Sequence, residues 1–575
     1  MGAVHRLLIA NRGEIAVRIL RACSEAGIAT VAVAAPGDEE ALHVALADDV
    51  REVPSYLDGG ALVAAALDAG ADAVHPGYGF LSERAGFAEA VIAAGLVWVG
   101  PSPAAMRALG DKVGARALAA ATGVPVVPGY SGPDLTDEAL GREAERLGAP
   151  LLVKAAGGGG GRGMRAVVDL AALPDALASA REEAAAAFGD DRVFLERRMV
   201  GVRHVEVQVL LDAHGNGVHL GERDCSLQRR HQKIVEESPA PGVGPEMRAA
   251  LGGASLSIAR EAGYEGVGTA EFLLVPDGTW WFLEMNARLQ VEHPVTEAVT
   301  GVDLVRAQLR VAAGESLDLT QDDVRLAGHA IEARVYAEDP TNAFLPVSGR
   351  IDLLALPHWP GVRIDTAVRE GDVVDLGFDP LLAKVIAVAP DRDTCLDRLR
   401  AVLAALRLVG VATNLGFLLD ALDHPDVRAG RAGTDWVADT WRHAVPPLPD
   451  GVHPAGDPAD PWRWFGDGSL PAGVAVAGTR AQYRGWSYEL ASDELEPVAI
   501  APPGGSLTAP MPASVGRVAV AVGDEVEPGQ IAVVLEAMKM QLRVDVPAAG
   551  TVRAVHVVEG DMVTAGQTLV EVEER

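Results

Sequence analysis

The segment 506–575 repeats itself with an offset of 37 residues, and this repeat restricts its fold more than any other feature of the chain. Six residues of the first half return in the second: Pro510, Gly523, Asp524, Val526, Gly529 and Gln530 recur as Pro547, Gly560, Asp561, Val563, Gly566 and Gln567. Apolar residues alternate within each half and Gly-Asp pairs interrupt them, which predicts short strands and tight turns. Because one half is too small to bury its own apolar face, we predict that the halves close into a pseudo-twofold β-sandwich or flattened barrel.

Lys539 lies at the junction of the two halves, between Met538 and Met540. We therefore expect this lysine near a protruding hairpin. An ordinary exposed lysine is the simplest interpretation of such a position. Exposed methionines are not needed for solubility, however, and they offer an adaptable surface that a modifying enzyme can bind. The pattern thus favours Lys539 as a modified residue.

The N-terminal residues 5–35 have the pattern of a strand, an amphipathic helix and a second strand. Such a βαβ unit predicts the start of a doubly wound parallel sheet. The unit lacks the GxGxxG fingerprint, so it does not indicate dinucleotide binding.

A run of five glycines lies within residues 150–168. Its last three residues are Gly159, Gly160 and Gly161. A phosphate-binding helix should follow such a loop, but 164–168 has the pattern of a strand and no Gly-Lys-Ser/Thr ends the run. We predict two strands joined by a lid, with Lys154 before it, whose backbone N–H groups fold over a polyphosphate. A plain linker is the alternative.

Residues 269–297 have the most specific spacing of polar residues in the chain. The Asp-Gly pair at 277–278 is a two-residue hairpin signal, and a two-residue loop there places Glu271 directly across from Glu284. Facing carboxylates repel each other unless one is protonated or a cation lies between them. Asn286 adds an oxygen on the same face, and an all-oxygen set favours Mg²⁺ or Mn²⁺ over zinc. We therefore predict a metal site; a solvent-facing strand edge is the alternative.

The same strand is predicted to continue beyond the hairpin and to stop at Pro294. Alternation along it places Arg288, Gln290 and Glu292 on one face.

Several ordered motifs between residues 4 and 440 resemble those of biotin carboxylase, an ATP-grasp enzyme. They read IANRGEIAVRI, HPGYGFLSE, GGGGGRGMR, ERDCSLQRRHQK, EMNARLQVEHPVTE and AEDP. Around Lys539, EAMKM with APMP upstream resembles the biotinyl carrier domain of biotin-dependent carboxylases, although Ala513 stands where that family usually has Gly. Together the motifs resemble the α subunit of a biotin-dependent acyl-CoA carboxylase, in which biotin carboxylase is fused to its carrier.

This resemblance implies a multidomain fold, α/β plus α+β, that ends in a small all-β domain. Its expected parts are a Rossmann-like pre-ATP-grasp domain (1–112), an ATP-grasp domain (113–325), a biotin carboxylase C-terminal domain (326–440), a linker or truncated intersubunit region (441–505) and a biotinyl carrier domain (506–575). The region 441–505 is rich in Pro, Gly and Trp, and its Trp462, Trp464 and Trp486 indicate either a docking surface or a small core.

The resemblance also implies a role for each matching residue. The residues implied in ATP binding are Lys112, Lys154, Gly159, Gly160, Gly161, Glu196, His204, Gln228 and His231. Mg²⁺ or Mn²⁺ is expected on Glu271, Glu284 and Asn286, and covalent biotin on Lys539. The implied catalytic residues are Lys233 beside bicarbonate or the transferred phosphoryl group, Arg288 holding bicarbonate, Glu292 as general base and Arg334 stabilising a biotin enolate.

Charge and composition narrow the range of partners. A formal net charge of −31 opposes general affinity for nucleic acids or anionic membranes. Three scattered cysteines, with neither a signal peptide nor a long apolar segment in the sequence, predict a cytoplasmic protein.

The domain assignment leaves no segment large enough for a carboxyltransferase. We therefore expect a separate carboxyltransferase β subunit, modification by a biotin protein ligase, and homo- and hetero-oligomers. Two alternatives are the carboxylase subunit of a two-subunit pyruvate carboxylase and a non-catalytic biotin carrier or assembly protein.

Overall fold

The structure, a computed structural model, describes residues 4–157, 164–442, 445–449, 474–477, 480–489, 506–509, 513–537, 540–563 and 567–574. The chain begins with a parallel sheet in the order β3-β2-β1-β4-β5. Its strands are β1 (Arg6–Ile9), β2 (Ala29–Ala34), β3 (Asp49–Glu52), β4 (Ala73–His75) and β5 (Val97–Trp98). The predicted βαβ unit is confirmed, because β1 and β2 are parallel and α1 (Gly13–Ala26) connects them. The helix ends at Gly27, whose φ of 71° is a left-handed conformation that glycine adopts easily because it has no Cβ.

Further helices pack around this sheet and connect it to the next part of the chain. They are α2 (Leu42–Leu46), α3 (Gly59–Asp68), α4 (Ala85–Ala93), α5 (Pro103–Gly110) and α6 (Lys112–Ala121). Lys112 is the first residue of α6, and the Asp111 side chain caps the helix by accepting from the Val113 N–H.

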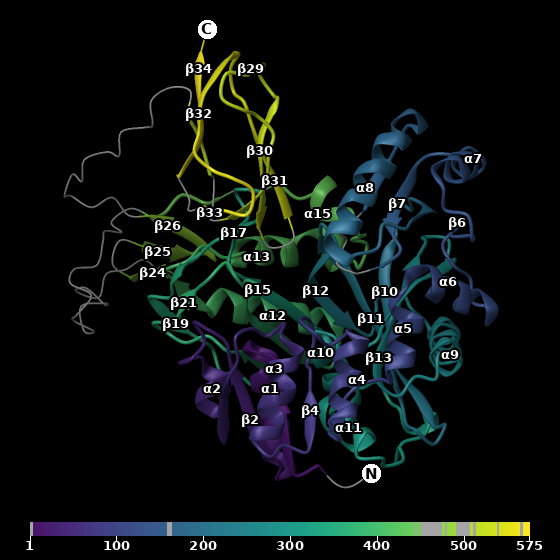
Figure 1. The fold of residues 1–575 in the computed structure, drawn as a ribbon. Helices are drawn as coiled ribbons and strands as arrows, with labels where there is room; N and C mark the ends of the chain where they lie inside the picture. Colours follow the sequence, from purple (N-terminus) through teal and green to yellow (C-terminus); the bar gives the residue numbers. More distant parts are fainter. Residues whose placement is uncertain are drawn as a thin grey trace.

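A four-stranded sheet in the order β6-β9-β7-β8 packs with α7 and α8 into a lobe with its own apolar core (Figure 1). The elements are β6 (Gly129–Tyr130), β7 (Leu151–Ala155), β8 (Arg165–Val167), β9 (Val193–Arg197), α7 (Asp137–Leu147) and α8 (Leu173–Phe188). β7 and β8 pair in antiparallel fashion, which confirms the strands predicted on both sides of the glycine run. Gly159, Gly160 and Gly161 themselves lie outside the described residues.

The centre of the molecule is an eight-stranded antiparallel sheet in the order β14-β13-β10-β11-β12-β15-β22-β20. Its strands are β10 (Arg203–Leu211), β11 (Gly217–Arg229), β12 (Gln232–Ser238), β13 (Gly266–Leu274), β14 (Trp280–Asn286), β15 (His329–Tyr336), β20 (Val362–Thr366) and β22 (Leu381–Ala389). Because β12 pairs directly with β15, one sheet runs without a break past residue 325.

Helices cover both faces of this sheet. α10 (His293–Thr300) packs Val295 and Val299 on one face, and α12 (Arg392–Ala405) packs Leu396 and Leu399 on the other. The other helices and short strands here are α9 (Pro245–Glu261), α11 (Leu304–Ala312), α13 (Leu415–Asp423), α14 (Pro425–Arg428), α15 (Trp436–Asp439), β16 (Glu338–Asp339), β17 (Leu345–Pro346), β18 (Gly349–Arg350), β19 (Leu353–Ala355), β21 (Val373–Val374) and β23 (Arg407–Val409).

The hairpin of β13 and β14 corrects one prediction while confirming another. Glu271 does face Glu284, as predicted. The loop is not a two-residue turn, however, because the Val275 N–H donates to the Thr279 carbonyl and three residues lie between them, the last being Gly278 with a φ of 89°. This three-residue loop shifts the register by one position, and a bulge between the pairs Glu271–Glu284 and Phe272–Phe282 shifts it back. The facing glutamates thus result from two deviations that cancel.

The predicted extension of this strand to Pro294 is wrong. β14 ends at Asn286, and Glu292 is the residue that precedes α10, with Pro294 in the first turn of that helix. Proline is favoured in the first turn of a helix, because the backbone N–H that proline lacks would have no hydrogen-bond partner within the helix there.

The described part of 441–505 contains a three-stranded sheet of β24 (Val474–Ala477), β25 (Arg480–Tyr483) and β26 (Trp486–Glu489). Trp486 is buried against Gly416 of α13, so this tryptophan belongs to a small core and not to a free docking surface. The buried Gln482 side chain accepts a hydrogen bond from the Leu408 N–H and fastens the sheet to β23. Trp462 and Trp464 lie outside the described residues.

The C-terminal region confirms the predicted pseudo-twofold β-sandwich. Its elements are β27 (Ser506–Thr508), β28 (Ala513–Val518), β29 (Glu525–Val526), β30 (Ile531–Ala537), β31 (Met540–Asp545), β32 (Gly550–Val555), β33 (Met562–Val563) and β34 (Thr568–Glu574). β28, β29 and β30 recur 37 residues later as β32, β33 and β34, in two four-stranded sheets at the top of Figure 1. Ala537 pairs with Met540, while Met538 and Lys539 lie outside the described residues.

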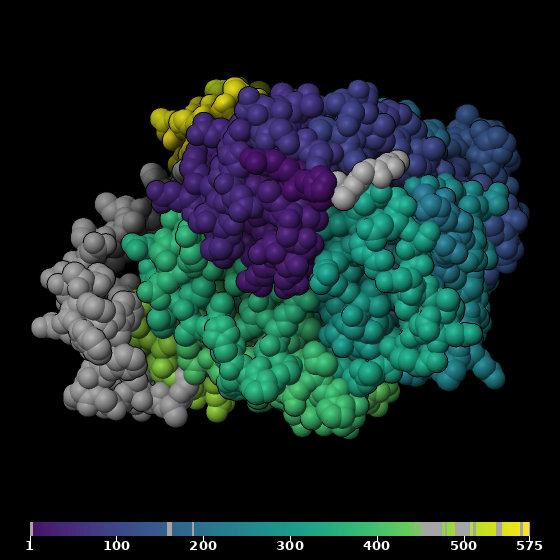
Figure 2. Space-filling model, turned by 90° about the horizontal axis from the view of Figure 1, so that it is seen from below, coloured from purple at the N-terminus to yellow at the C-terminus, as the bar shows by residue number. Residues whose placement is uncertain are grey.

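Seen from below, the N-terminal segment covers the middle of one face, next to the teal central segments (Figure 2).

None of the helices in the described part of the chain combines the length and the apolar character that crossing a membrane requires.

Candidate active site

Lys233, at the start of β12, lies at the centre of a buried group of carboxylates. Its Nζ donates to Glu271 at 2.8 Å and to Glu292 at 2.7 Å, and it also contacts Glu206. Burial by itself would lower the pKa of Lys233, but the three glutamates raise it well above its ordinary value. Lys233 therefore stays protonated and holds together three strands and the start of α10.

Glu206 on β10 is a site residue that the sequence analysis missed. It faces Glu271 across the β10–β13 pair and accepts a hydrogen bond at 2.6 Å from Arg223, which is completely buried on β11. The sequence carries one signal for it, since His204, Glu206 and Gln208 form a polar face along an otherwise apolar strand.

The facing glutamates on β13 and β14 each have their own cationic neighbour. Glu271 contacts His204 at 3.1 Å as well as Lys233, whereas Glu284 lies 3.6 Å from Lys112. Burial raises the pKa of Glu271, but Lys233 and His204 outweigh it, so that the pKa falls below its usual range. The ammonium groups of Lys112 and Lys233 and the imidazole of His204 therefore offset the repulsion between Glu271 and Glu284 without a metal ion.

A divalent ion fits the same residues. The carboxylates of Glu271 and Glu284 and the amide oxygen of Asn286 are the hard oxygen donors that Mg²⁺ and Mn²⁺ prefer. Asn286 already lies close enough for its Nδ2 to donate to Glu271 Oε1 at 2.8 Å. Glu284 is partly exposed, with 28% of its side chain accessible, so one side of the group is open to an incoming ligand.

Cations also gather at the junction with the lobe of β6 to β9. Lys154 on β7 and Arg116 on α6 both pair with Glu196 of β9, whose side chain is only 2% exposed. The Lys112 N–H donates to the Ala156 carbonyl at 2.9 Å and joins α6 to the end of β7. The structure thus brings Lys112 and Lys154, both predicted to bind ATP, to the same edge of the lobe.

The turn between β11 and β12 has an unusual backbone. Arg230 and His231 have φ values of 48° and 67°, and the pair Arg229–Gln232 closes the turn around them. Two successive non-glycine residues with positive φ are strained, and such strain is concentrated at functional sites. Nearby, Gln228 Nε2 lies 3.4 Å from His204 Nδ1, and burial lowers the pKa of His231.

Two arginines complete the site. Arg288 donates to Gln290 at 2.9 Å and lies 3.2 Å from Glu83, a second residue absent from the predictions. Arg334 on β15 donates to Glu292 at 2.9 Å.

Glu292 therefore lies between Lys233 and Arg334. Burial would raise the pKa of Glu292, but these two cations lower it well below its usual range. The carboxylate is consequently ionised, which is the form that a proton acceptor requires.

Four family profiles match successive parts of the chain. They are "Biotin carboxylase, N-terminal domain" at residues 3–106, "Carbamoyl-phosphate synthase L chain, ATP binding domain" at 111–320, "Biotin carboxylase C-terminal domain" at 332–439 and "Biotin-requiring enzyme" at 505–572.

Individual proteins show the same similarity. The α subunit of mitochondrial methylcrotonoyl-CoA carboxylase from Mus musculus is 45% identical over 77% of this chain, and the match spans 63% of the mouse protein. The biotin-dependent acyl-coenzyme A carboxylase alpha3 subunit of Mycobacterium leprae is 41% identical over 99% of this chain and 98% of its own length. The crystal structure of the biotin carboxylase domain of Hydrogenobacter thermophilus 2-oxoglutarate carboxylase, with MgADP, ADP and bicarbonate, superposes with a TM-score of 0.75 at 40% identity, covering 76% of this chain and 98% of that one.

Proposed function

Since the chain belongs to the biotin carboxylase family and carries a biotinyl carrier domain, we propose that it carboxylates its own biotin with ATP and bicarbonate and supplies the carboxyl group to a separate carboxyltransferase. The observation that carries this proposal is the position of Glu292, an ionised carboxylate held between Lys233 and Arg334. The proposed general base thereby contacts both a phosphate-binding cation and a guanidinium.

Nucleotide binding is assigned to the cations beside the lobe. Lys112 and Lys154 bind phosphate oxygens, with the glycine run 159–161 as the lid and Gln228 and His231 beside them. Glu271, Glu284 and Asn286 would hold Mg²⁺ or Mn²⁺, which would neutralise charge on the phosphates. His204 and Glu196 orient the groups that contact the nucleotide, through Glu271 and Lys154 respectively.

Bicarbonate is assigned to Arg288, whose planar guanidinium matches a planar oxyanion. Glu292 takes the bicarbonate proton, a bicarbonate oxygen forms a bond to the γ-phosphorus of ATP, and the bond to ADP breaks. The resulting carboxyphosphate yields carbon dioxide and phosphate, with Lys233 neutralising the transferred phosphoryl group.

Biotin is assigned to Lys539, where its ureido nitrogen would accept the carbon dioxide and give its proton to the phosphate released from carboxyphosphate. Arg334 orients the ureido oxygen of biotin through hydrogen bonds. The acceptor we favour is an acyl-CoA, because a relative that matches nearly the whole chain is named for acyl-coenzyme A carboxylation. A keto acid such as pyruvate is the alternative, and the carboxyltransferase that copurifies with the chain decides between them.

The test uses purified protein with free biotin, ATP, Mg²⁺ and labelled bicarbonate. Wild type is expected to cleave ATP in a bicarbonate-dependent way and to form carboxybiotin. Arg334→Ala is expected to slow biotin carboxylation far more than it weakens nucleotide binding. A wild-type protein without bicarbonate-dependent ATP cleavage would point instead to a non-catalytic carrier or assembly protein.

A further inference from the structure

We propose that Glu236 is a positioning residue that holds Arg334 in its working orientation, with Glu332 behind it as a neutral carboxylic acid. This inference rests on the proposed function, because it gives a reason for the placement of an arginine assigned to biotin. Neither glutamate belongs to the predicted site.

The three side chains share one face of the central sheet. Glu236 on β12 lies directly opposite Glu332 on β15, and Arg334 follows two positions later on the same face. Both glutamates are 0% exposed. Arg334 Nε lies 2.6 Å from Glu236 Oε1, while its Nη2 donates to Glu292 Oε2 at 2.9 Å. The guanidinium is thus fixed by one carboxylate near the reacting groups and by a second one deeper in the sheet.

Charge balance shows which of the two paired glutamates carries a proton. The charged groups that act on Glu332 are Lys384 from β22, Glu236 from β12, Arg334 from β15 and Glu292 before α10. Lys384 is already occupied, because it lies 3.1 Å from Glu14 and donates to the Val291 carbonyl.

Glu332 accordingly has no cation of its own, and neither of its oxygens has a hydrogen-bond partner among the described residues. Burying an unpaired carboxylate is very unfavourable, whereas the protonated form carries no charge. Burial raises the pKa of Glu332 well above its usual range against the opposing charges of Lys384 and Arg334, and the nearby Glu236 raises it further. The neutral Glu332 then lies opposite Glu236 across the pair of β12 and β15.

Glu236 becomes important at the step of the proposed reaction in which Glu292 is protonated. When Glu292 accepts the bicarbonate proton it loses its charge, and its hold on Arg334 weakens. Glu236 does not take part in that transfer, so it keeps the guanidinium in place during the following step. Burial raises the pKa of Glu236 to about 7 despite the nearby Arg334 guanidinium, which favours the ionised form.

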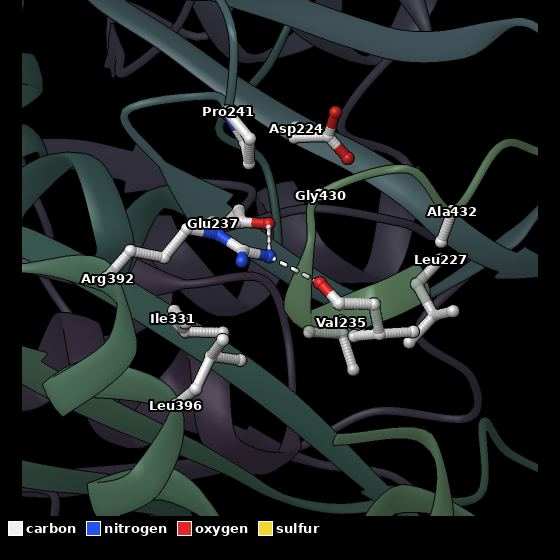
Figure 3. Close-up of a pocket in the computed structure, with 11 residues that line it drawn as sticks. Asp224, Leu227, Val235, Glu237, Pro241, Ile331, Arg392, Leu396, Gly430 and Ala432 are labelled. Atoms are coloured by element: carbon white, nitrogen blue, oxygen red, sulfur yellow. Dashed lines mark hydrogen bonds and ion pairs between the residues drawn. The ribbon is translucent and has the colours of Figure 1, made fainter. Parts of the chain in front are cut away.

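The next residue on β12 provides a matched control. Glu237 points to the opposite face, where it accepts hydrogen bonds from Arg392 at 2.7 and 2.9 Å (Figure 3). It also contacts His329 at 2.8 Å. Both glutamates therefore pair with an arginine in the interior, but only Glu236 pairs with one assigned to the reaction.

The experiment compares Glu236→Gln with Glu237→Gln in the full-length chain, with free biotin as the substrate. Glu236→Gln is expected to lower kcat for biotin carboxylation by about tenfold or more, the scale of a slightly misplaced group, while the Kd for MgADP stays at its wild-type value. Glu237→Gln is expected to lower the melting temperature without that selective loss of kcat. Equal kcat in Glu236→Gln and wild type, or the same selective loss in both variants, would overturn the assignment.

Infrared spectroscopy tests the protonation of Glu332 separately. The wild-type spectrum is expected to contain a protonated carboxyl band that Glu332→Gln lacks, and a spectrum in which that band is unchanged by the substitution contradicts a neutral Glu332. A wild-type chain that fails to carboxylate free biotin contradicts the proposed function, whereas this infrared difference does not depend on turnover.

Discussion

At the scale of single residues, the site is organised by carboxylates that share a small number of cations. Lys233 contacts Glu206, Glu271 and Glu292, and removing any partner of a buried ion group leaves an uncompensated charge. Glu284 differs from these glutamates because it is partly exposed and lies 3.6 Å from its cation. It is therefore the carboxylate whose loss tests metal binding without disrupting the interior.

Glu284→Gln is expected to abolish most Mg²⁺-dependent ATP cleavage, by about 10- to 100-fold or more, because it removes one charged oxygen donor from the predicted metal site. The fold should persist, since the change also removes one of two facing negative charges. ATP cleavage and thermal melting measure the two effects. Glu261→Gln, on the exposed end of α9, serves as the control, and normal turnover in Glu284→Gln would remove the metal assignment.

His75, on β4 and fully buried, makes stability depend on pH. Its Nδ1 accepts a hydrogen bond from the Gly77 N–H at 3.0 Å, and burial lowers its pKa from 6.5 to about 3. The unfolded chain therefore binds a proton below pH 6.5 that the folded chain does not bind, and stability falls as the pH decreases towards 3.

This difference corresponds to about 2 kcal/mol between pH 8 and pH 5. Urea unfolding at the two pH values should show a smaller loss for His75→Asn, which keeps an acceptor for Gly77 but does not titrate. Identical pH dependence in both proteins would show that His75 does not contribute.

At the scale of elements, hairpins place most of the site. The bulge in the β13–β14 hairpin restores the register that brings Glu271 opposite Glu284, and the strained turn at Arg230 and His231 returns the chain so that Lys233 enters the carboxylate group. The position of the small sheet of 474–489, by contrast, is decided by side-chain packing. Trp486 fits against Gly416, where any larger side chain on α13 would collide with the indole ring.

Trp486→Ala is expected to destabilise the β24–β26 sheet by about 3 kcal/mol, because it leaves a cavity against α13. Hydrogen exchange and limited proteolysis of 474–489 should increase, while ATP cleavage with free biotin should not change. Trp359→Ala, at an indole that is 41% exposed, is the control. Unchanged protection of 474–489 in Trp486→Ala would contradict the packing described for this sheet.

At the scale of the whole molecule, the carboxylase regions and the carrier are parts of one chain. Leu345 and Leu376, which come from the region that follows β15, pack against the core of the carrier sandwich. A carrier on the same chain keeps its cofactor at a high effective concentration near the site that charges it.

Lys539→Arg is expected to give a protein that never acquires biotin, because a guanidinium does not form the required amide. Intact-mass measurement after expression with a biotin ligase should show one added biotin on wild type and none on the variant. The variant should still cleave ATP with free biotin, since Lys539 is remote in sequence from that site. A retained mass increment in Lys539→Arg would place the modification at another residue.

The sequence by itself determined the local features: the repeat that became two matching halves, the strands beside the glycine run, the first βαβ unit and the residues of the family motifs. These depend on periodicity and spacing, which a linear chain displays directly. Only the tertiary structure decided that Glu206, Glu236 and Glu332 belong with Lys233, Glu292 and Arg334. Those contacts follow from the order β10-β11-β12-β15 and from the packing of α10 on that sheet, and strand order brings together residues whose separation in sequence carries no period. The β13–β14 hairpin likewise could not be predicted in full from the sequence. Its loop and its bulge depend on how β14 packs and pairs and not on the Asp-Gly signal alone.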